Sequence, residues 1–383
     1  MRNIGIVCVT WLFVTLSMAM TVTSVVAATL RVEQRGGGDF TTIQPAVDAA
    51  ASGDTVLVGF GRYLEYAPFD FGALTEDTYI VVTKPNLTLM GTDRDSVIVG
   101  PEIYDWPSAY QPNGVGTIAS ATGLRIQDMT FENIPEGIVL EGPGEVSNCR
   151  IIGSRVGFGS FSTTGASVID CQVVDSRSLG IAYWTGLSGV LVRGCSLEGP
   201  FSHLFISQAQ DALVENVTAI GGAFLQFQMF SSGTMRDCTV SGGGGISILD
   251  SNAELSGNRV STPSSACLVV ANGSVTGDGN VFSGGQDVTL FVRAMSEVTF
   301  RDNHILSGGN YTLRLDSYSS PNFNLDFRNN YWGTADSLQI ADLIFDGSDG
   351  VPDWPIVQFS PFLTAPVPVR NSSFGGLKGS YRE

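Results

Sequence analysis

The sequence predicts an all-β solenoid, a fold in which short parallel strands wind into coils that stack on one another. Three observations support this fold class. A short motif recurs ten times between Asp128 and Trp332, a second apolar segment fills each period, and every copy contains a residue type that tolerates a tight bend. Such a period is typical of solenoids, because one unit buries its apolar face only against its neighbours.

The motif is organised around one residue, here called the anchor, with apolar residues three positions before it and two after it. Clear copies are Val-Ser-Asn-Cys-Arg-Ile (146–151) and Met-Arg-Asp-Cys-Thr-Val (235–240). Steps of 20 to 27 residues separate the ten anchors, which are Met129, Cys149, Cys171, Cys195, Val217, Cys238, Asn258, Asn280, Asn303 and Asn330. A coil of this length has room for three short strands, and successive coils would lie about 4.8 Å apart.

The residue before every anchor is Asn, Asp or Gly. These types tolerate the left-handed backbone of a tight bend, so we expect a bend at the same place in each coil. Gly277 departs from the pattern, because it occupies the first apolar position of the copy anchored at Asn280. We expect an insertion in that coil.

The anchors change from mainly cysteine to asparagine along the chain. Stacked cysteines would be close enough for disulfides. Met129 and Val217 occupy the same column, however, which favours buried, unpaired thiols that pack as small apolar residues. The later asparagines can form an amide ladder that satisfies backbone groups of the bends.

A short helix over about residues 41–51 is expected to close the amino-terminal end of the coil stack. Ile43, Val47 and Ala50 recur at helical spacing after a Thr41-Thr42 cap. A solenoid needs such a lid because an open sheet end recruits other chains.

Together these patterns resemble the right-handed parallel β-helix of the pectin-lyase-like superfamily. The run from Gly38 to Ala50, with Gly53-Asp54-Thr55-Val56-Leu57-Val58 and Gly61-Arg62-Tyr63-Leu64-Glu65, is similar to its amino-terminal cap and first coil. Asn330-Tyr331-Trp332-Gly333-Thr334 and Phe359-Ser360-Pro361-Phe362-Leu363 are similar to its closing segment. The resemblance implies one right-handed parallel β-helix of about eleven or twelve coils over residues 29–364, followed by a flexible tail at 365–383.

That superfamily contains lyases, hydrolases and esterases that act on acidic polysaccharides, but their motifs are missing here. The Gly-His-Gly of polygalacturonases, the Trp-Ile-Asp-His of pectate lyases and the Gly-Arg-Pro-Trp of pectin methylesterases do not occur. Gln210-Asp211-Ala212-Leu213 only superficially echoes an esterase motif, so we interpret Asp211 as a loop residue.

Residues 1–28 have one positive charge, Arg2, then an uncharged apolar run that finishes Val-Val-Ala-Ala. This is the pattern of a cleaved secretory signal peptide, with an uncleaved anchor as the alternative. Without it, 19 basic and 37 acidic residues leave a net charge of about −18. We expect a secreted or extracytoplasmic monomer, at the cell surface or in the periplasm, that binds neither nucleic acid nor, after cleavage, membrane.

Outward positions on the second apolar segment of each coil form the expected ligand face. If Ile138 and Leu140 point inward, then Val139 and Glu141 point outward, and so do Ala182 and Trp184. Phe161 should lie one coil from Trp184, and this exposed aromatic pair is our candidate for stacking on sugar rings. A flanking loop that covers the pair is the alternative.

Other polar residues are weaker candidates for chemistry. Carboxylates that could serve in catalysis are Glu141, Asp250 and Asp316, and Arg293 and Arg314 lie at the ends of comparable strands. His203 and His304 are too far apart to share a metal, and His203 is interpreted as a packed ring. No cofactor is required, although Asp346, Asp349 and Asp353 form a candidate calcium site in a stretch that turn formation also explains.

The leading hypothesis is an exported β-helix that binds carbohydrate or a surface polymer along one face without a standard pectinase active site. A polysaccharide lyase or glycoside hydrolase with atypical catalytic residues is the first alternative, and a structural surface protein is the second. Whether the protein is catalytic stays open, because fold alone does not decide function.

Overall fold

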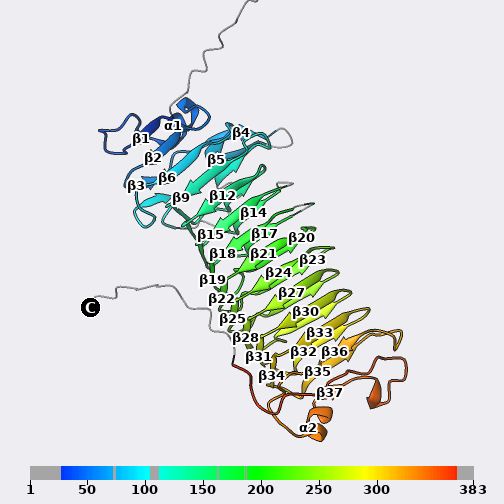
Figure 1. Ribbon diagram of the computed structural model, residues 1–383. Coiled ribbons are helices and arrows are strands. Elements are labelled where there is room, and N and C mark those ends of the chain that lie inside the picture. The colour runs from blue at the N-terminus through cyan, green and yellow to red at the C-terminus, as the bar shows by residue number, and fades with distance from the viewer. Residues whose placement is uncertain are drawn as a thin grey trace, which may run out of the picture.

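The computed structural model describes residues 27–71, 75–103, 112–161, 164–184, 186 and 188–368. It is a right-handed parallel β-solenoid of about 12 turns with very little helix, as the sequence predicts (Figure 1). Residues 1–26 of the predicted signal peptide and 369–383 of the predicted tail lie outside the described residues. Among the residues that the structure describes, no helix is both long and apolar enough to cross a bilayer.

Most coils contribute one strand to each of three sheets, here called A, B and C, and almost all neighbours pair in parallel. Sheet A contains β1 (Thr29–Val32), β2 (Thr55–Val58), β6 (Thr88–Gly91), β9 (Leu124–Gln127), β12 (Gly144–Ser147), β15 (Ala166–Ile169), β18 (Leu191–Arg193), β21 (Ala212–Glu215), β24 (Ser232–Arg236), β27 (Asn252–Ser256), β30 (Ser274–Asp278), β33 (Glu297–Arg301) and β36 (Leu325–Asp326).

Sheet B contains β3 (Gly61–Tyr63), β7 (Val97–Val99), β10 (Thr130–Glu132), β13 (Arg150–Ile152), β16 (Gln172–Val174), β19 (Ser196–Glu198), β22 (Thr218–Ile220), β25 (Thr239–Ser241), β28 (Arg259–Thr262), β31 (Val281–Gly284) and β34 (His304–Ser307). Sheet C contains β4 (Ala67–Asp70), β5 (Thr75–Val82), β8 (Asn113–Thr117), β11 (Glu136–Leu140), β14 (Val156–Ser160), β17 (Leu179–Tyr183), β20 (Leu204–Ser207), β23 (Leu225–Gln228), β26 (Ile246–Leu249), β29 (Leu268–Ala271), β32 (Val288–Arg293), β35 (Tyr311–Asp316) and β37 (Ile344–Phe345). Within sheet C, β4 and β5 pair in antiparallel fashion.

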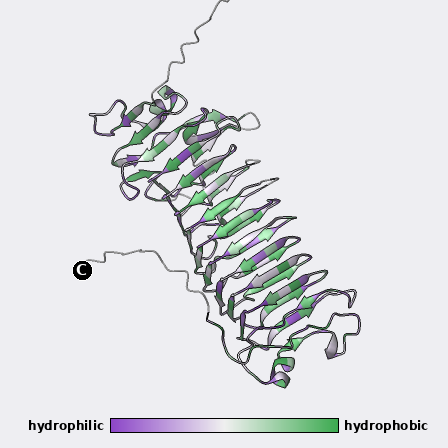
Figure 2. Cartoon of the chain, viewed as in Figure 1, coloured by the Kyte–Doolittle hydropathy of each residue, from purple (hydrophilic) through white to green (hydrophobic). Residues whose placement is uncertain are grey.

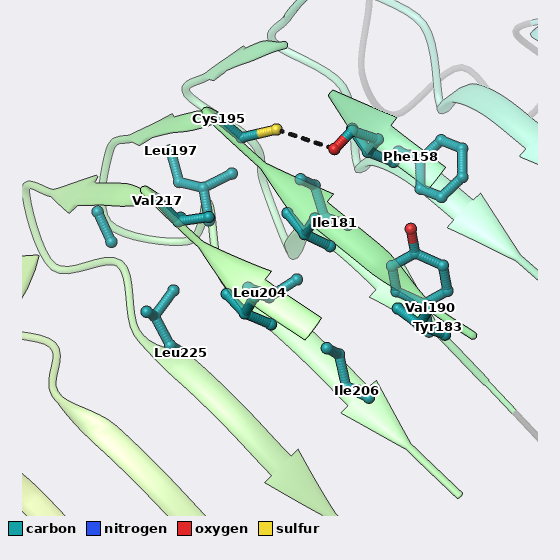
Figure 3. Packing of buried hydrophobic residues seen from close by; sticks show 14 of the residues in the cluster. Phe158, Ile181, Tyr183, Val190, Cys195, Leu197, Leu204, Ile206, Val217 and Leu225 are labelled. Atoms are coloured by element: carbon teal, nitrogen blue, oxygen red, sulfur yellow. Dashed lines mark hydrogen bonds between the residues drawn. The ribbon is translucent and has the colours of Figure 1, made fainter. Parts of the chain in front are cut away.

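The core is a set of columns in which matching side chains from successive coils stack. Ile181, Leu204 and Leu225 are register partners on neighbouring strands of sheet C, and all three are fully buried (Figure 3). Along many strands buried and more exposed positions alternate, as in β2 and β27, so that one face of the sheet packs inward while the other meets solvent, and Figure 2 shows the hydropathy of these strands. The solenoid therefore buries one continuous apolar core along its axis.

The predicted bends are present at every motif. The ten residues that precede the anchors all adopt left-handed backbone, with φ between 48° at Asn148 and 66° at Gly194. They connect sheet A to sheet B, and they place each anchor side chain inside the coil at the start of the next strand. The left-handed bend predicted at each motif is therefore confirmed. It explains why Asn, Asp and Gly occupy this position, since most other L-residues are sterically strained in this conformation.

The anchor column is buried, and its cysteine and asparagine side chains make hydrogen bonds to the preceding coil. Each cysteine Sγ lies near a backbone carbonyl of the preceding coil, as in Cys171 with Val146 O at 3.6 Å, and the thiols are unpaired. The asparagines continue the column as a ladder, in which Asn258 Nδ2 donates to Asn280 Oδ1 at 2.9 Å and Asn280 Nδ2 donates to Asn303 Oδ1 at 2.8 Å. Asn258 Nδ2 also donates to Met235 O at 2.9 Å. Thiol and amide groups thus bond to the same backbone carbonyl of the preceding coil, which is the one three residues before that coil's anchor.

The insertion expected near Gly277 does not exist. Strand β30 pairs with β27 residue for residue from Ser274 to Asp278. A Cβ atom at Gly277 would lie 2.8 Å from Cε1 of Phe300, the residue of the next coil that occupies the same column. Glycine is required because this ring, the backbone carbonyl of Leu255 at 2.9 Å and Asn280 Nδ2 at 3.0 Å leave no room for a side chain.

Both ends of the coil stack are covered. Helix α1 (Ile43–Ala49) buries Ile43, Ala46 and Val47 against the first coil, although its N-cap residue Thr42 makes no side-chain capping bond, contrary to the expected threonine cap. At the other end lie α2 (Ser337–Asp342) and the 3-10 helix η1 (Gly347–Asp349). Ile340 of α2 is buried, so this segment closes the carboxyl-terminal end of the core.

Candidate functional site

Five of the ten predicted site residues lie in one column on the outer side of sheet C. The strand register stacks residues from nine successive coils, which are Glu141, Phe161, Trp184, Ser207, Gln228, Leu249, Ala271, Arg293 and Asp316. We call this set the C-edge column, because it follows the carboxyl ends of the sheet C strands. Ala182, which was also expected to face outward, is fully buried and unavailable to a ligand.

Phe161 and Trp184 form the predicted aromatic pair. Their ring centroids lie 4.7 Å apart with an interplanar angle of 17°, and Phe161 is 42% exposed. The indole lies close to the backbone, since a Cβ atom at Gly159 would lie 2.9 Å from its Cζ3 atom. Glycine at 159 therefore lets the tryptophan settle against the sheet beside the phenylalanine.

Glu141 is the next member of the column, one coil before Phe161. Its backbone N–H donates to Thr117 Oγ1 at 2.8 Å, and its side chain is partly buried. Burial raises the pKa of this carboxyl group. A carboxyl group of raised pKa beside an aromatic pair could hold a proton or accept hydrogen bonds from hydroxyl groups.

The three candidate carboxylates do not come together. Five coil steps separate Glu141 from Asp250, which follows Leu249, and three separate Asp250 from Asp316; at about 4.8 Å per step these are roughly 24 and 14 Å. Glycosidase carboxylate pairs lie at about 5–10 Å. The residues predicted as alternatives for one catalytic carboxylate thus cannot pair with one another.

The two candidate arginines lie at the carboxyl-terminal end of the face. Arg293 Nε pairs with Asp316 Oδ2 at 3.2 Å, and the guanidinium carbon of Arg293 lies 5.3 Å from the ring centroid of Phe291. Arg314 lies between two rings, at 5.8 Å from Phe291 and 6.0 Å from Phe345. Exposed pairs of this kind stabilise a surface weakly, as the sequence suggested.

A cavity of about 410 Å³ lies at the corner where sheet C turns into sheet A. Asp250 lines it, whereas Asp211 sits beyond its edge, where its backbone N–H donates to Ser232 Oγ at 3.3 Å. Two exposed residues of the cavity wall, Phe230 and Met295, escaped the sequence analysis. The number of residues between the sheet C strand and the sheet A strand of each coil was the signal that could have revealed them, because it differs between neighbouring coils.

Neither histidine lies in a site of this kind. His203 stacks on Phe224, with ring centroids 3.7 Å apart, and burial lowers its pKa to about 4. Its Nδ1 accepts the backbone N–H of Phe224 at 3.3 Å. His304 is mostly buried beside Tyr331. Both are packed rings, in line with the interpretation made for His203.

The candidate calcium segment forms a turn. Asp346 Oδ1 accepts from the Ser348 backbone N–H at 2.8 Å, its Oδ2 accepts from that of Val357 at 2.7 Å, and Asp349 Oδ2 accepts from that of Asp346 at 2.9 Å. Asp353 is exposed. In the part of the chain that the structure describes, no three His, Cys, Asp or Glu side chains are placed to hold a metal ion. Calcium binding there stays a prediction that this geometry does not support.

Solved structures with the same architecture include several polysaccharide-active enzymes. The A-module of the mannuronan C-5 epimerase AlgE4 from Azotobacter vinelandii has a TM-score of 0.59 at 13% identity, covering 84% of this chain and 94% of the module. The periplasmic alginate epimerase AlgG has a TM-score of 0.49 at 11% identity, with 73% and 77% covered. The catalytic unit of a GH87 α-1,3-glucanase from Streptomyces thermodiastaticus has a TM-score of 0.41 at 12% identity, with 71% and 63% covered.

A search of curated proteins gave no significant match to the sequence. The family model described as "Right handed beta helix region" matches residues 113–242 and 227–334, which together make up more than half of the chain. Its two matched ranges cover the coils that carry the anchor column and the C-edge column. The chain therefore belongs to the right-handed β-helix family, which confirms at the level of fold its resemblance to the pectin-lyase-like superfamily.

Proposed function

We propose that this protein binds carbohydrate, or a similarly hydroxylated surface polymer, along the outer face of sheet C. The stacked pair of Phe161, which is exposed, and Trp184, which is partly exposed, is the observation that carries the proposal. Large aromatic groups left in water cost free energy, and flat rings on a rigid sheet suit the apolar C–H faces of sugar rings. We further propose that residues 1–28 direct the chain out of the cytoplasm, where such polymers occur.

The geometry of the C-edge column supports a chain-like ligand. Members of the column repeat at the coil spacing, so a polymer that lies along the solenoid axis meets a new side chain at each step of about 4.8 Å. Glu141, one coil before Phe161, is partly exposed and offers a carboxyl group that bonds hydroxyls, whereas Ser207 on the other side of the pair is buried. Stacking would then fix the position of one sugar ring, and neighbouring polar groups would orient it.

The solved structures add limited support. One of them, the AlgE4 A-module, is named for an enzyme that acts on mannuronan, and it has the same fold as this chain. The same fold therefore occurs in an enzyme whose name states a polysaccharide as its substrate. Because a shared fold does not transmit function, the argument for this protein depends on its own exposed residues.

The test is a binding measurement with Trp184→Ala, Phe161→Ala and a matched surface control. Leu338→Ala is the control, because Leu338 is an exposed apolar residue (75%) on α2 at the carboxyl-terminal end of the solenoid, many coils from the aromatic pair. We expect either aromatic variant to weaken binding to the best ligand on a broad glycan array by about tenfold, while the control binds as the wild type does. Unchanged binding by both aromatic variants, with unchanged melting temperatures, would show the proposal to be wrong.

A second function is favoured by one observation, the raised pKa of Glu141 one coil from the aromatic pair. We propose as the alternative that the protein is a polysaccharide lyase or hydrolase with Glu141 as its acid group, since a general acid must hold its proton near the working pH. Incubation with a polysaccharide panel, followed by assays for unsaturated and reducing ends, tests this. Product formation that Glu141→Gln abolishes supports catalysis, and no product from any polymer rejects it.

A further inference from the structure

The corners between sheet C and sheet A differ in length, and this difference shapes the cavity described above. The strand register leaves two residues between the sheets after Leu249 and after Ala271. Three residues fill the same corner in the coils on either side, after Gln228 and after Arg293. Two short corners therefore lie between two longer ones, and the surface is recessed over them.

The longer corners place apolar side chains in solvent on both sides of the recess. Met229 and Phe230 are 50% and 78% exposed on one side, and Met295 is 61% exposed on the other. Phe230 and Met295 both line the cavity. Residues at a solvated corner have no need of large apolar side chains, and two such residues facing one recess favour contact with a ligand.

Phe230 is also held in a conformation that costs energy. Its φ is 67°, and it is the one aromatic residue with left-handed backbone in the described part of the chain. The corner is fixed from several sides: its N–H donates to Asp250 O at 2.6 Å, its carbonyl accepts from Gln210 Nε2 at 2.6 Å, and Ser232 Oγ donates to Gln210 Oε1 at 2.8 Å. Strain that its surroundings maintain is typical of binding sites.

The floor of the recess is polar. Asp250 and Asn272, the first residues of the two short corners, are exposed and joined by a hydrogen bond from Asn272 Nδ2 to Asp250 Oδ1 at 2.9 Å. The second oxygen of Asp250 and the amide oxygen of Asn272 can still accept bonds from hydroxyl groups. The lining contains one carboxylate and no Lys, Arg or His, so that a negatively charged sugar would be repelled.

We propose that this corner groove, lined by Gln210, Phe230, Asp250, Asn252, Asn272 and Met295, is a binding site for a neutral sugar unit. Asp250 and Asn272 bond its hydroxyl groups, and Phe230 packs on its apolar face. The walls stand three coil steps apart, about 14 Å at the strand spacing, which suits one or two linked pyranose rings. The volume of about 410 Å³ lies within the range of small-molecule sites.

The groove is separate from the aromatic pair of the C-edge column, because two coil steps divide Trp184 from Gln228, the residue before the groove wall. The inference therefore does not depend on the proposed function of the sheet C face. Either site can be correct while the other is wrong, and the experiment distinguishes them.

The experiment measures the affinity of neutral gluco-, manno- and galacto-hexasaccharides by titration calorimetry, with a hexauronate as the charged comparison. Phe230→Gly and Asp250→Ala test the groove, Trp184→Ala tests the face, and Leu338→Ala is the control. We expect Phe230→Gly to weaken binding of a neutral hexasaccharide by at least tenfold. Its melting temperature should stay equal or rise, since glycine adopts left-handed backbone without strain. Asp250→Ala should weaken binding about fivefold or more.

Each outcome has one meaning. Loss of affinity in the two groove variants, with Trp184→Ala unchanged, supports the groove and not the face. Loss in Trp184→Ala alone, or equal affinity in all variants, overturns the groove. A wild-type protein that binds the hexauronate only, or none of these probes, overturns it as well.

Discussion

Replacing Asn280 by leucine should destabilise the protein strongly, although the two side chains are similar in volume. Asn280 is fully buried, and its amide makes four bonds: Nδ2 donates to Leu255 O and Asn303 Oδ1, both at 2.8 Å, and Oδ1 accepts from the backbone N–H and from Nδ2 of Asn258, both at 2.9 Å. Leucine removes all four at once.

The magnitude follows from what each partner retains. Asn258 Nδ2 still donates to Met235 O, and Asn303 Oδ1 still accepts from the backbone N–H of residue 280, so these groups lose one bond each, worth about 0.5–1.5 kcal/mol. The backbone N–H of Asn258 loses its acceptor in the core, which costs about 1–3 kcal/mol. Together with the bond to Leu255, we expect a loss of about 3–5 kcal/mol.

Cys171→Val is the matched control in the same column, because it replaces a buried thiol whose hydrogen bonds are weak. Its cost should stay below about 1.5 kcal/mol. Guanidinium unfolding followed by circular dichroism and tryptophan fluorescence measures both variants, with the probes compared because a solenoid can unfold in stages. If Asn280→Leu costs less than about 1 kcal/mol, or no more than Cys171→Val, the ladder does not hold the coils together as argued.

Two further predictions concern titrating groups. Burial raises the pKa of Cys238 to about 12, and all five described thiols are buried, so they should resist a thiol reagent at pH 7.5 until the chain unfolds. The free energy of unfolding should fall as the pH rises above about 8.5, the pKa of a thiol in the unfolded chain. Fast labelling of several thiols in the native protein would contradict this. Burial would raise the pKa of Glu215, but hydrogen bonds from Arg236 and Arg193 outweigh it and hold the pKa below its usual range. Glu215 therefore stabilises the fold above about pH 4.3 and loses this effect as the pH falls. Glu215→Gln should lower the free energy of unfolding by about 1–2 kcal/mol at pH 7, and it should reduce the dependence of that free energy on pH in the acid range. An unchanged dependence on pH would show that the cluster of Glu215 with Arg193 and Arg236 contributes nothing to stability.

The sequence predicted those features that repeat at a fixed spacing. The residue before each anchor is one of the three types that tolerate a left-handed bend, and most inward positions are apolar, so the coil period and the parity of the sheet C strands were both recoverable. Parity is what placed Phe161 one coil from Trp184. Local chemistry with a fixed backbone requirement leaves a clear mark in a single sequence.

Features that depend on contacts between coils were harder to predict. Gly277 suggested an insertion, because nothing near it in the chain shows that the ring of Phe300 fills its place. The groove at Asp250 was missed because its walls, Phe230 and Met295, lie about 65 residues apart in sequence and meet only through the stacking of coils. Asp346 and Asp349 suggested metal ligands, since the sequence does not show which backbone N–H groups a carboxylate will meet.

The exchange of space between Gly277 and Phe300 makes two coils dependent on each other. In a repeat protein, one turn can in principle be duplicated or lost when each turn contacts only its neighbours and fits them in the same way. Across this junction a change at 277 is restricted from both sides, because a Cβ atom there would meet the ring of Phe300 in the next coil at 2.8 Å and the backbone carbonyl of Leu255 in the preceding coil at 2.9 Å. The junction therefore limits where this protein can gain or lose a turn.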